Sequence, residues 1–251
     1  MSEADASGQN GKLLGAIFDV DGVLVASPHE RAWREALDGY ADPARFTTEF
    51  YQTRVAGRPR LDGARAALEG LGVADAAART PEYAAKKQAL IDRLIAQGSF
   101  KAFPDALRFA AALHGLGLRL ALASSSKNVA AMLSRLRLPD DRPLMSIFTA
   151  DLSGTDVPRG KPDPALFLLA AQALHVQPAQ SLVVEDAPAG IVAARAGGMA
   201  SVGIARLGDE ELLRAAKADL VVTSLDQVDT DGVPQRKLRT HSFGTQIPSF
   251  G

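Results

Sequence analysis

The spacing of hydrophobic positions changes twice along the chain. Residues 13–18 form an apolar run too short for a helix, which predicts a strand buried on both faces, as in a parallel sheet. From residue 42 to residue 97 the apolar positions recur at helical spacing, and no strand-like run interrupts them. Beyond Phe103 short apolar runs alternate with helical segments, which indicates a parallel sheet covered on both sides. The pattern therefore predicts an α/β core interrupted by a helical insert.

Turn residues and apolar periodicity give approximate limits for each element. Helices are predicted over 28–37, 44–55, 61–71, 81–95, 105–114, 127–136, 164–174, 187–196 and 209–216, and strands over 13–18, 118–123, 146–149, 181–185, 201–204 and 220–222. Two turn-rich crossings, 25–28 and 98–104, flank the insert. We expect residues 1–11 to form a flexible tail. Residues 226–251 are polar and have no clear period, so they either wrap the core or stay mobile.

Composition excludes several classes of protein. With 47% hydrophobic and 23% charged residues in 251, the chain is a globular protein able to bury one large core or two smaller ones. Its 28 basic and 29 acidic residues form no long run of one sign, so neither a nucleic-acid nor a membrane partner is indicated. The absence of cysteine excludes disulfides and thiolate sites. A polar N-terminus and the lack of a long apolar run predict a cytoplasmic protein with a small-molecule partner.

Two acids follow the first predicted strand. Side chains alternate along a strand, so Asp19 and Asp21 leave on roughly the same side, and Gly22 lets the chain turn tightly behind them. Carboxylates held side by side repel each other unless a cation or a proton lies between them. Taken alone, the pair could equally fill a turn or cap a helix.

Other reactive side chains follow the later strands. Ligands of open parallel sheets bind beyond the carboxyl ends of the strands, where we expect these residues to converge: Asp19, Asp21, Ser124, Lys161, Glu185 and Asp186. Acids, a hydroxyl and an amine suit phosphoryl transfer, in which each repulsion between unit charges at about 4 Å costs on the order of 4 kcal/mol. A lysine and a divalent cation would offset that repulsion. Individually, Ser124 could cap a helix, Lys161 could be a solvated loop residue, and Glu185–Asp186 could favour a helix N-terminus.

Four stretches in chain order resemble the motifs of the haloacid dehalogenase superfamily of phosphoryl-transfer enzymes. They are Asp19-Val-Asp21-Gly, Ala123-Ser-Ser125, Gly160-Lys-Pro-Asp-Pro164 and Val184-Glu-Asp-Ala187. The resemblance covers residues 13 to about 205 and implies a Rossmann-like doubly wound parallel sheet with an inserted helical cap. Its implied limits are a core of 12–27 and 102–228, a cap of 28–101, and tails of 1–11 and 229–251.

The resemblance also assigns roles at the matching positions. Asp19 would be the nucleophile that forms an aspartyl-phosphate, and Asp21 the general acid and base. Ser124 and Lys161 would hold the phosphoryl group. Mg²⁺ would be bound by Asp19, Asp186 and the backbone carbonyl of Asp21, with Glu185 either a further ligand or a neighbour of the ligands.

Within the superfamily, the chain is most similar to the beta-phosphoglucomutase group. The similarity lies in Ala121-Leu-Ala-Ser-Ser-Ser-Lys-Asn128, in His29 four residues before Trp33, and in Gly57-Arg-Pro-Arg60-Leu-Asp-Gly63. It implies that Arg60 grips the phosphate that is not transferred. The implied substrate-binding residues are His29, Trp33, Arg60, Lys87, Ser125, Lys127 and Asn128. Each cation alone could instead be a solvated surface residue, and His29 an ordinary residue on a helix surface.

The sequence thus predicts a monomeric, Mg²⁺-dependent enzyme acting on a small phosphorylated sugar. Isomerisation of the beta-phosphoglucomutase kind is the first expectation. A sugar-phosphate phosphatase is the alternative, because both reactions pass through the same intermediate and differ in whether water reaches it. A non-catalytic binding protein is a more remote third possibility.

Overall fold

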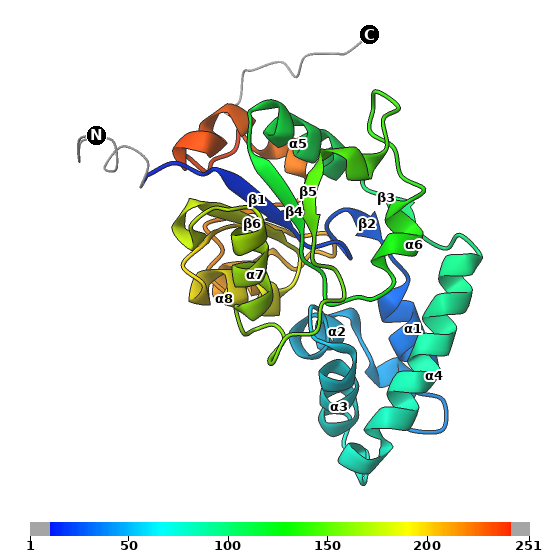
Figure 1. The fold of residues 1–251 in the computed structure, drawn as a ribbon. Helices are drawn as coiled ribbons and strands as arrows, with labels where there is room; N and C mark the ends of the chain where they lie inside the picture. The colour runs from blue at the N-terminus through cyan, green and yellow to red at the C-terminus, as the bar shows by residue number, and fades with distance from the viewer. Residues whose placement is uncertain (1–10, 242–251) are drawn as a thin grey trace.

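Six parallel strands form the central sheet of the computed structural model, which describes residues 11–241 (Figure 1). Their order is β5-β4-β1-β6-β7-β8, so the chain winds outward from β1 in both directions. The strands are β1 (Gly15–Phe18), β4 (Arg119–Leu122), β5 (Phe148–Asp151), β6 (Ser181–Glu185), β7 (Ala200–Ile204) and β8 (Leu220–Val222). The switch in winding direction leaves a crevice at the carboxyl ends of the central strands, where such sheets bind ligands.

Alternating strand residues supply two apolar layers, one on each face of the sheet. Ala16 and Phe18 belong to a large buried cluster with α5 (Pro104–Gly115) and α6 (Val129–Leu133). Ile17, between them, belongs to a second cluster with α7 (Ala165–Ala173) and α8 (Pro188–Ala196). The short α9 (Glu210–Ala215) packs against α8, β7 and β8. The predicted doubly wound α/β core is confirmed.

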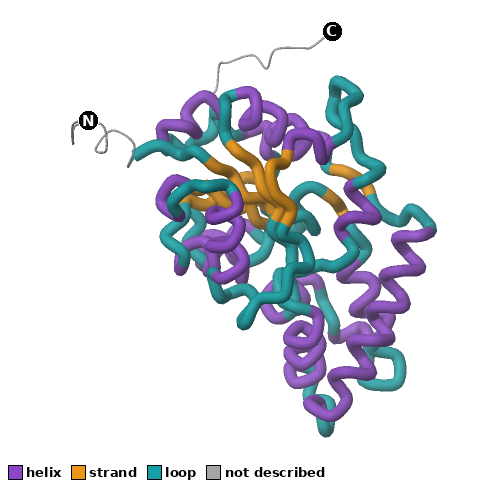
Figure 2. The backbone as a smooth tube through the Cα atoms, in the orientation of Figure 1, coloured by secondary structure: helices purple, strands orange, loops and turns teal. Residues whose placement is uncertain are grey.

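The insert between β1 and β4 is helical and extends away from the sheet (Figure 2). It contains α1 (His29–Ala36), α2 (Thr48–Arg54), α3 (Arg60–Gly70) and α4 (Ala76–Ala96). These helices share their own apolar cluster around Trp33, Phe46 and Tyr83, and the Tyr83 hydroxyl donates to the Trp33 carbonyl at 2.9 Å. The last turns of α4 join the sheet cluster through Ile91 and Ile95.

The sequence indicated only turns in the two crossings, but the structure also has a short antiparallel ribbon there. In this ribbon β2 (Val25–Ala26) pairs with β3 (Lys101–Ala102). Two residues per strand are too few to show a two-residue alternation, so the sequence carried no signal for it. The ribbon joins the insert to the sheet through two neighbouring strands.

Two predicted helices in the insert were placed wrongly. The single helix expected over 44–55 is a 3₁₀ turn (Pro43–Arg45) followed by α2, because the Thr47 hydroxyl accepts from the Phe50 amide and starts a new helix. The helix expected to begin at Pro81 begins at Ala76, and Pro81 lies within its second turn. The alanines before Pro81 are strong helix formers, which explains the earlier start.

Smaller differences lie in the core. The helix predicted over 127–136 is limited to α6, and the strand predicted over 146–149 is displaced to β5 by a preceding 3₁₀ turn (Leu144–Ile147). The C-terminal stretch, as far as residue 241, wraps the core: Val228 and Val233 are buried, and the Pro234 carbonyl accepts from the Leu13 amide at 2.9 Å. Two 3₁₀ turns, Leu225–Gln227 and Thr230–Gln235, lie in it. Most of the predicted N-terminal tail, residues 1–10, and residues 242–251 lie outside the described residues.

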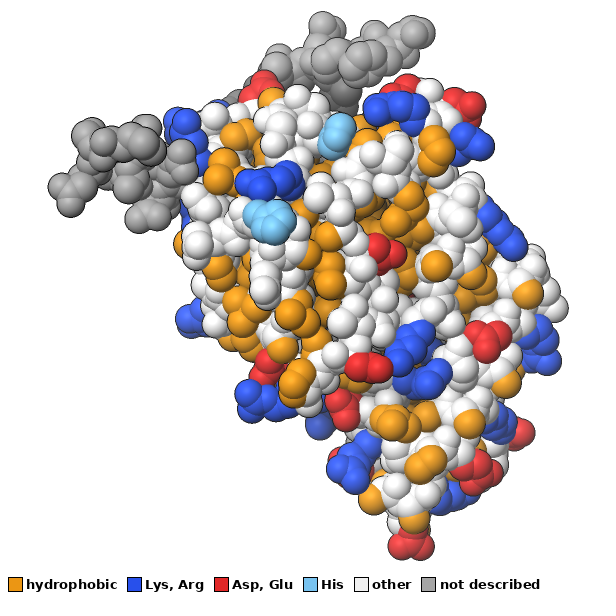
Figure 3. All heavy atoms as spheres, viewed as in Figure 1, with side chains coloured by type: hydrophobic (Ala, Val, Ile, Leu, Met, Phe, Trp, Pro, Cys, Tyr) orange, Lys and Arg blue, Asp and Glu red, His pale blue; other side chains and the backbone are white. Residues whose placement is uncertain are grey.

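Charges of both signs are interspersed over the surface seen in Figure 3. Within residues 11–241, none of the helices has the length and apolar character needed to cross a membrane.

A largely buried ion pair of the core, between Arg206 and Asp105, also anchors the start of the C-terminal stretch through Asp105. Arg206 donates to both carboxylate oxygens of Asp105, at 2.8 and 3.1 Å, and its guanidinium lies 3.9 Å from the centre of the Phe103 ring. Asp105 also accepts from the Ser224 hydroxyl at 3.1 Å and the Leu225 amide at 2.8 Å. Burial alone would raise the pKa of Asp105, but these hydrogen bonds outweigh it and leave that pKa below its usual value.

We expect Arg206→Met to lower the free energy of unfolding by about 2 kcal/mol at pH 7, because a charged hydrogen bond is lost from a buried carboxylate. The depressed pKa of Asp105 means that its contribution is present above its unfolded value of about 3.9 and disappears as pH falls below it. The difference between variant and wild type should therefore shrink in acid. Urea unfolding of Arg108→Met, whose pair with Asp226 is half exposed, is the control and should change by less than about 1 kcal/mol.

Candidate active site

The carboxyl ends of three neighbouring strands bring the predicted core residues to one edge of the sheet. Asp19 follows β1, Ser124 lies two residues beyond β4, and Glu185 is the last residue of β6. The ladder continues past the strand ends, because the Asp19 amide donates to the Val184 carbonyl at 3.0 Å. This pairing fixes the backbone from which the candidate residues project.

Lys161 reaches the same edge from the loop before α7. Its ammonium is buried and donates to Asp19 Oδ1 and Glu185 Oε1, each at 2.6 Å, and to the Ala123 carbonyl at 3.2 Å. Burial by itself lowers the pKa of Lys161, but the two carboxylates outweigh burial and raise it above the usual value. Lys161 is therefore a buried cation paired with two carboxylates rather than a solvated loop lysine.

Glu185 holds this lysine with both of its carboxylate oxygens engaged. Oε1 accepts from Lys161, and Oε2 accepts from the backbone amides of Asp186 and Ala187, each at 2.9 Å. Glu185 therefore positions Lys161 against Asp19.

Asp19, which is already paired with Lys161, and Asp186 bring further negative charge to the site. Burial and the neighbouring carboxylates of Glu185 and Asp21 raise the pKa of Asp19 to about 7, although Lys161 opposes them. Burial, Glu185 and Asp19 likewise raise the pKa of Asp186 well above its usual value. Excess negative charge of this kind favours binding of a proton or a cation.

The loop after Asp21 is pressed onto Asp186. Gly22 has a φ of +84°, and a Cβ atom there would stand only 1.8 Å from Asp186 Oδ2, so a larger residue would strain the backbone and displace the Asp186 carboxylate. Within the described part of the chain, no group of three or more His, Cys, Asp or Glu side chains is arranged to hold a metal ion. Asp19 and Asp186 are two carboxylates that, together with a backbone carbonyl and water, would form a donor set that suits Mg²⁺.

Ser124 is buried beside these groups and is not the cap of the following helix. Its hydroxyl oxygen accepts from the Ser126 amide at 3.1 Å, which leaves its hydrogen available to another acceptor. The residue before α6 is Asn128, and its side chain makes no capping hydrogen bond. The alternative of a simple helix cap is thus excluded.

The helical insert contributes a second set of polar groups, centred on His29 at the start of α1. Its Nδ1 lies 2.7 Å from Lys87 Nζ, and its Nε2 lies 3.5 Å from Asp21 Oδ2 and 3.4 Å from Ser126 Oγ. Burial lowers the pKa of His29 to about 4 and that of Lys87 to about 7. The Lys87 ammonium also lies 4.8 Å from the centre of the Trp33 ring. His29 therefore links Asp21 of the core to a helix of the insert.

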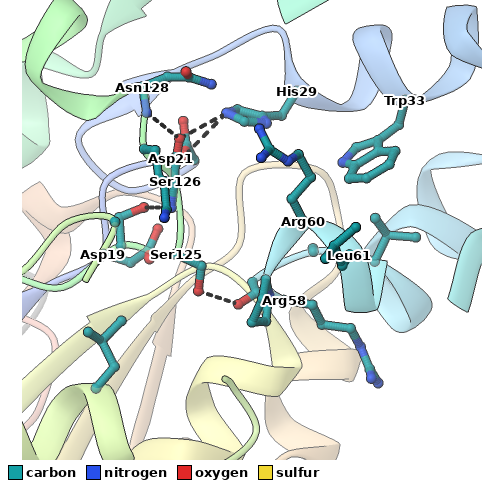
Figure 4. A pocket seen from close by; sticks show the side chains of 18 of the residues that line it. Asp19, Asp21, His29, Trp33, Arg58, Arg60, Leu61, Ser125, Ser126 and Asn128 are labelled. Carbon is teal, nitrogen blue, oxygen red and sulfur yellow. Dashed lines mark hydrogen bonds and ion pairs between the residues drawn. The ribbon is translucent and has the colours of Figure 1, made fainter. Parts of the chain in front are cut away.

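A cavity of about 270 Å³ lies between the insert and the sheet edge. Figure 4 shows Arg60, the first residue of α3, extending across this cavity, whereas Arg58 points away from it. Arg60 Nη1 donates to Gln88 Oε1 at 2.6 Å, and Gln88 Nε2 donates to Asn128 Oδ1 at 3.0 Å. A hydrogen-bonded chain thus runs from α3 through α4 to the core.

The remaining predicted residues lie at the cavity wall. Ser125 Oγ donates to the Gly57 carbonyl at 3.1 Å, and exposed Lys127 pairs with Asp156 at 2.9 Å. Four more residues line the same cavity but were not predicted as site residues from the sequence: Gln88, Ser126, Tyr51 and Asp156. Ser126 was signalled by its place in a run of three serines, and Gln88 only by its position next to Lys87.

Comparisons with known proteins agree with this geometry. The family of haloacid dehalogenase-like hydrolases matches residues 14–198. A beta-phosphoglucomutase of Mycobacterium tuberculosis is 33% identical, covering 86% of this chain and 92% of its own. A validoxylamine A 7'-phosphate phosphatase of Streptomyces hygroscopicus subsp. limoneus is 31% identical, covering 85% and 94%. The crystal structure of a beta-phosphoglucomutase from a Pyrococcus species superposes with a TM-score of 0.66 at 30% identity, covering 84% and 92%.

Proposed function

This chain belongs to the haloacid dehalogenase-like hydrolase family as an enzyme of its phosphomutase and phosphatase type, and we propose that it isomerises a small phosphorylated sugar. The substrate we propose is beta-glucose 1-phosphate or a close analogue. The reaction passes through a phosphorylated Asp19. Residues 28–101 act as a cap over a core made of residues 12–27 and 102–228.

The proposed reaction has two halves that use the same groups. Phosphorylated Asp19 passes its phosphoryl group to the sugar 6-hydroxyl, while Asp21 removes the hydroxyl proton. The bisphosphate turns round, Asp19 attacks the phosphorus at C1, and Asp21 returns the proton to the departing oxygen. Glucose 6-phosphate leaves and Asp19 is phosphorylated again, so atoms and charge balance over the cycle.

Core residues lower the electrostatic barrier of both halves. The Lys161 ammonium, held by Glu185, faces Asp19 and offsets the repulsion between carboxylate and phosphoryl group. The Ser124 hydroxyl is free to donate to a phosphoryl oxygen. Bound Mg²⁺, for which Asp19, Asp186 and the Asp21 carbonyl are the proposed ligands, would supply further positive charge at that group.

The observation that carries the mutase proposal is Arg60 on the cap side of the cavity. A phosphatase acting on a monoester needs one anion site, whereas a bisphosphate intermediate needs a second. Arg60 offers a bidentate donor there, and Gln88 orients it while also reaching Asn128 of the core. Lys127 and Asn128 face the same space from the core side.

Hydrolysis is the second candidate, because the phosphatase relative is about as similar as the mutase. A phosphatase would use the same Asp19, Asp21, Ser124 and Lys161 and would admit water to phosphorylated Asp19. The two functions are separated by supplying beta-glucose 1-phosphate, Mg²⁺ and a trace of glucose 1,6-bisphosphate and measuring both products. We expect glucose 6-phosphate without an equal release of phosphate. Phosphate release alone would establish a phosphatase. If neither glucose 6-phosphate nor phosphate is formed, the proposed sugar is wrong.

We expect Arg60→Ala to lower kcat/KM for isomerisation about 100-fold, because a charged hydrogen bond to the distant phosphate is lost. Hydrolysis of p-nitrophenyl phosphate, which has no second phosphate, should fall far less. Arg65→Ala, on the exposed face of the same helix, is the matched control. Equal losses for both substrates would show that Arg60 does not bind the second phosphate.

A further inference from the structure

One loop of the cap, residues 55–60, rests directly on the core. Its Gly57 carbonyl accepts from the Ser125 hydroxyl at 3.1 Å. A Cβ atom at Gly57 would stand 3.3 Å from the Cβ of Ala187, so the backbone already touches the start of α8. The loop ends at Arg60, the first residue of α3. Its seating on the core therefore helps to place Arg60 over the cavity.

Pro59 of this loop lies against the backbone of Gly160. A Cβ atom at Gly160 would stand 2.0 Å from Cγ and 2.3 Å from Cδ of Pro59, whereas the Pro59 Cβ is 3.5 Å away. The proline ring therefore occupies the volume that any side chain at Gly160 would need. Gly160 is not among the residues with a left-handed backbone, so alanine suits its conformation and only space forbids it.

The position of this contact connects it to the chemistry. Pro59 precedes Arg60 of the cap, and Gly160 precedes Lys161 of the core. The cap is joined to the core through the β2–β3 ribbon, so tilting about the ribbon would change the distance between Pro59 and Gly160. We propose that the bare backbone at Gly160 receives the Pro59 ring and so sets how far the cap closes over Asp19.

Under the proposed function, on which this inference rests, the degree of closure decides the fate of the phosphoryl group. A fully seated cap excludes water from phosphorylated Asp19 and leaves the sugar hydroxyl as its acceptor. A side chain at Gly160 would meet the Pro59 ring and hold the cap away from the core. Water would then compete for the same phosphoryl group, and Gly160 acts as a determinant of specificity without touching the substrate.

A double-mutant cycle tests this contact. The variants are Gly160→Ala, Pro59→Ala and the two combined, because Pro59→Ala removes both atoms that an alanine at 160 would strike. The matched control is Gly115→Ala, where a new Cβ meets nothing within 4 Å. For each we would measure the ratio of free phosphate to glucose 6-phosphate formed. Acrylamide quenching of Trp33, the one tryptophan in the chain and part of the cavity wall, reports closure without turnover.

We expect Gly160→Ala to raise the ratio of phosphate to glucose 6-phosphate about tenfold and to increase quenching of Trp33. In the Pro59→Ala background the same substitution should change neither quantity by more than about twofold. Equal effects of Gly160→Ala in both backgrounds would overturn the inference. If the wild type proves to be a phosphatase, the proposed isomerisation fails on its own, and the coupling seen in Trp33 quenching still decides whether Pro59 and Gly160 control closure.

Discussion

Asp19→Asn should abolish turnover, lowering kcat by at least about 10⁴-fold, because an amide cannot accept the phosphoryl group that we propose is transferred to the carboxylate. The variant should remain folded, since asparagine has the same shape as aspartate and removes a buried negative charge. Lys161 would keep its hydrogen bond to Glu185. The measurements are steady-state turnover and capture of phosphorylated protein by intact mass after brief exposure to acetyl phosphate.

Asp21→Asn provides the comparison that separates nucleophile from acid. Acetyl phosphate has a leaving group that needs no proton, so this variant should still become phosphorylated, whereas Asp19→Asn should not. Asp38→Asn, which changes an exposed acid of the helical insert, should behave as wild type in both assays. Phosphorylation of Asp19→Asn at the wild-type rate would show that the nucleophile lies elsewhere.

The core of the fold could be predicted because its signals are local. Each buried strand is a short apolar run, and parallel neighbours place the residues after those runs at one edge of the sheet. The sequence therefore predicts that Asp19, Ser124 and Asp186 lie close together, and the structure places all three at the wall of one cavity. The covering of both sheet faces followed from the same alternation of strands and helices, whereas the order β5-β4-β1-β6-β7-β8 was not predicted.

Features that depend on contacts between distant segments could not be predicted. Lys161 and Glu185 are 24 residues apart in sequence. Only the folded chain reveals that one Glu185 oxygen accepts from the lysine and the other accepts from two backbone amides. Gln88 has no distinctive neighbours in sequence, yet it joins Arg60 to Asn128. The β2–β3 ribbon is likewise formed by segments too short to carry a pattern of their own.

The buried charge cluster makes Lys161→Met the most destabilising substitution that we expect. Methionine approximates the length of the lysine but leaves Asp19 and Glu185 without their shared cation in a buried site. Breaking a buried ion pair by removing one partner costs about 3–5 kcal/mol in the free energy of unfolding. Activity should be lost as well. Among the described residues, no other basic side chain forms an ion pair with Asp19. Lys86→Met, a partly exposed lysine, is the control and should change stability by less than about 1 kcal/mol.

The pH dependence of Lys161→Met follows from Asp19. Its folded-state pKa is already raised to about 7 with the lysine present, and removal of the lysine raises it further. A carboxyl with a raised folded-state pKa binds more protons in the folded than in the unfolded chain, so stability falls as pH rises above the unfolded value of about 3.9. In the wild type this decrease in stability ends near pH 7, whereas in the variant stability continues to decrease at higher pH. The stability deficit should therefore be larger at pH 8.5 than at pH 5.5.

A second substitution separates charge from packing as the cause. Adding Glu185→Gln to Lys161→Met removes one of the two unpaired carboxylates, so the double variant should recover part of the lost stability at pH 8.5. The glutamine oxygen can still accept from the backbone amides of Asp186 and Ala187, so Glu185→Gln removes charge while keeping these contacts. If the lysine contributed only packing, removing that charge would recover no stability. A deficit that is equal at both pH values and is not reduced in the double variant would therefore contradict the electrostatic account. Recovery would show that Lys161 stabilises the core by balancing the charge of the buried carboxylates of Asp19 and Glu185.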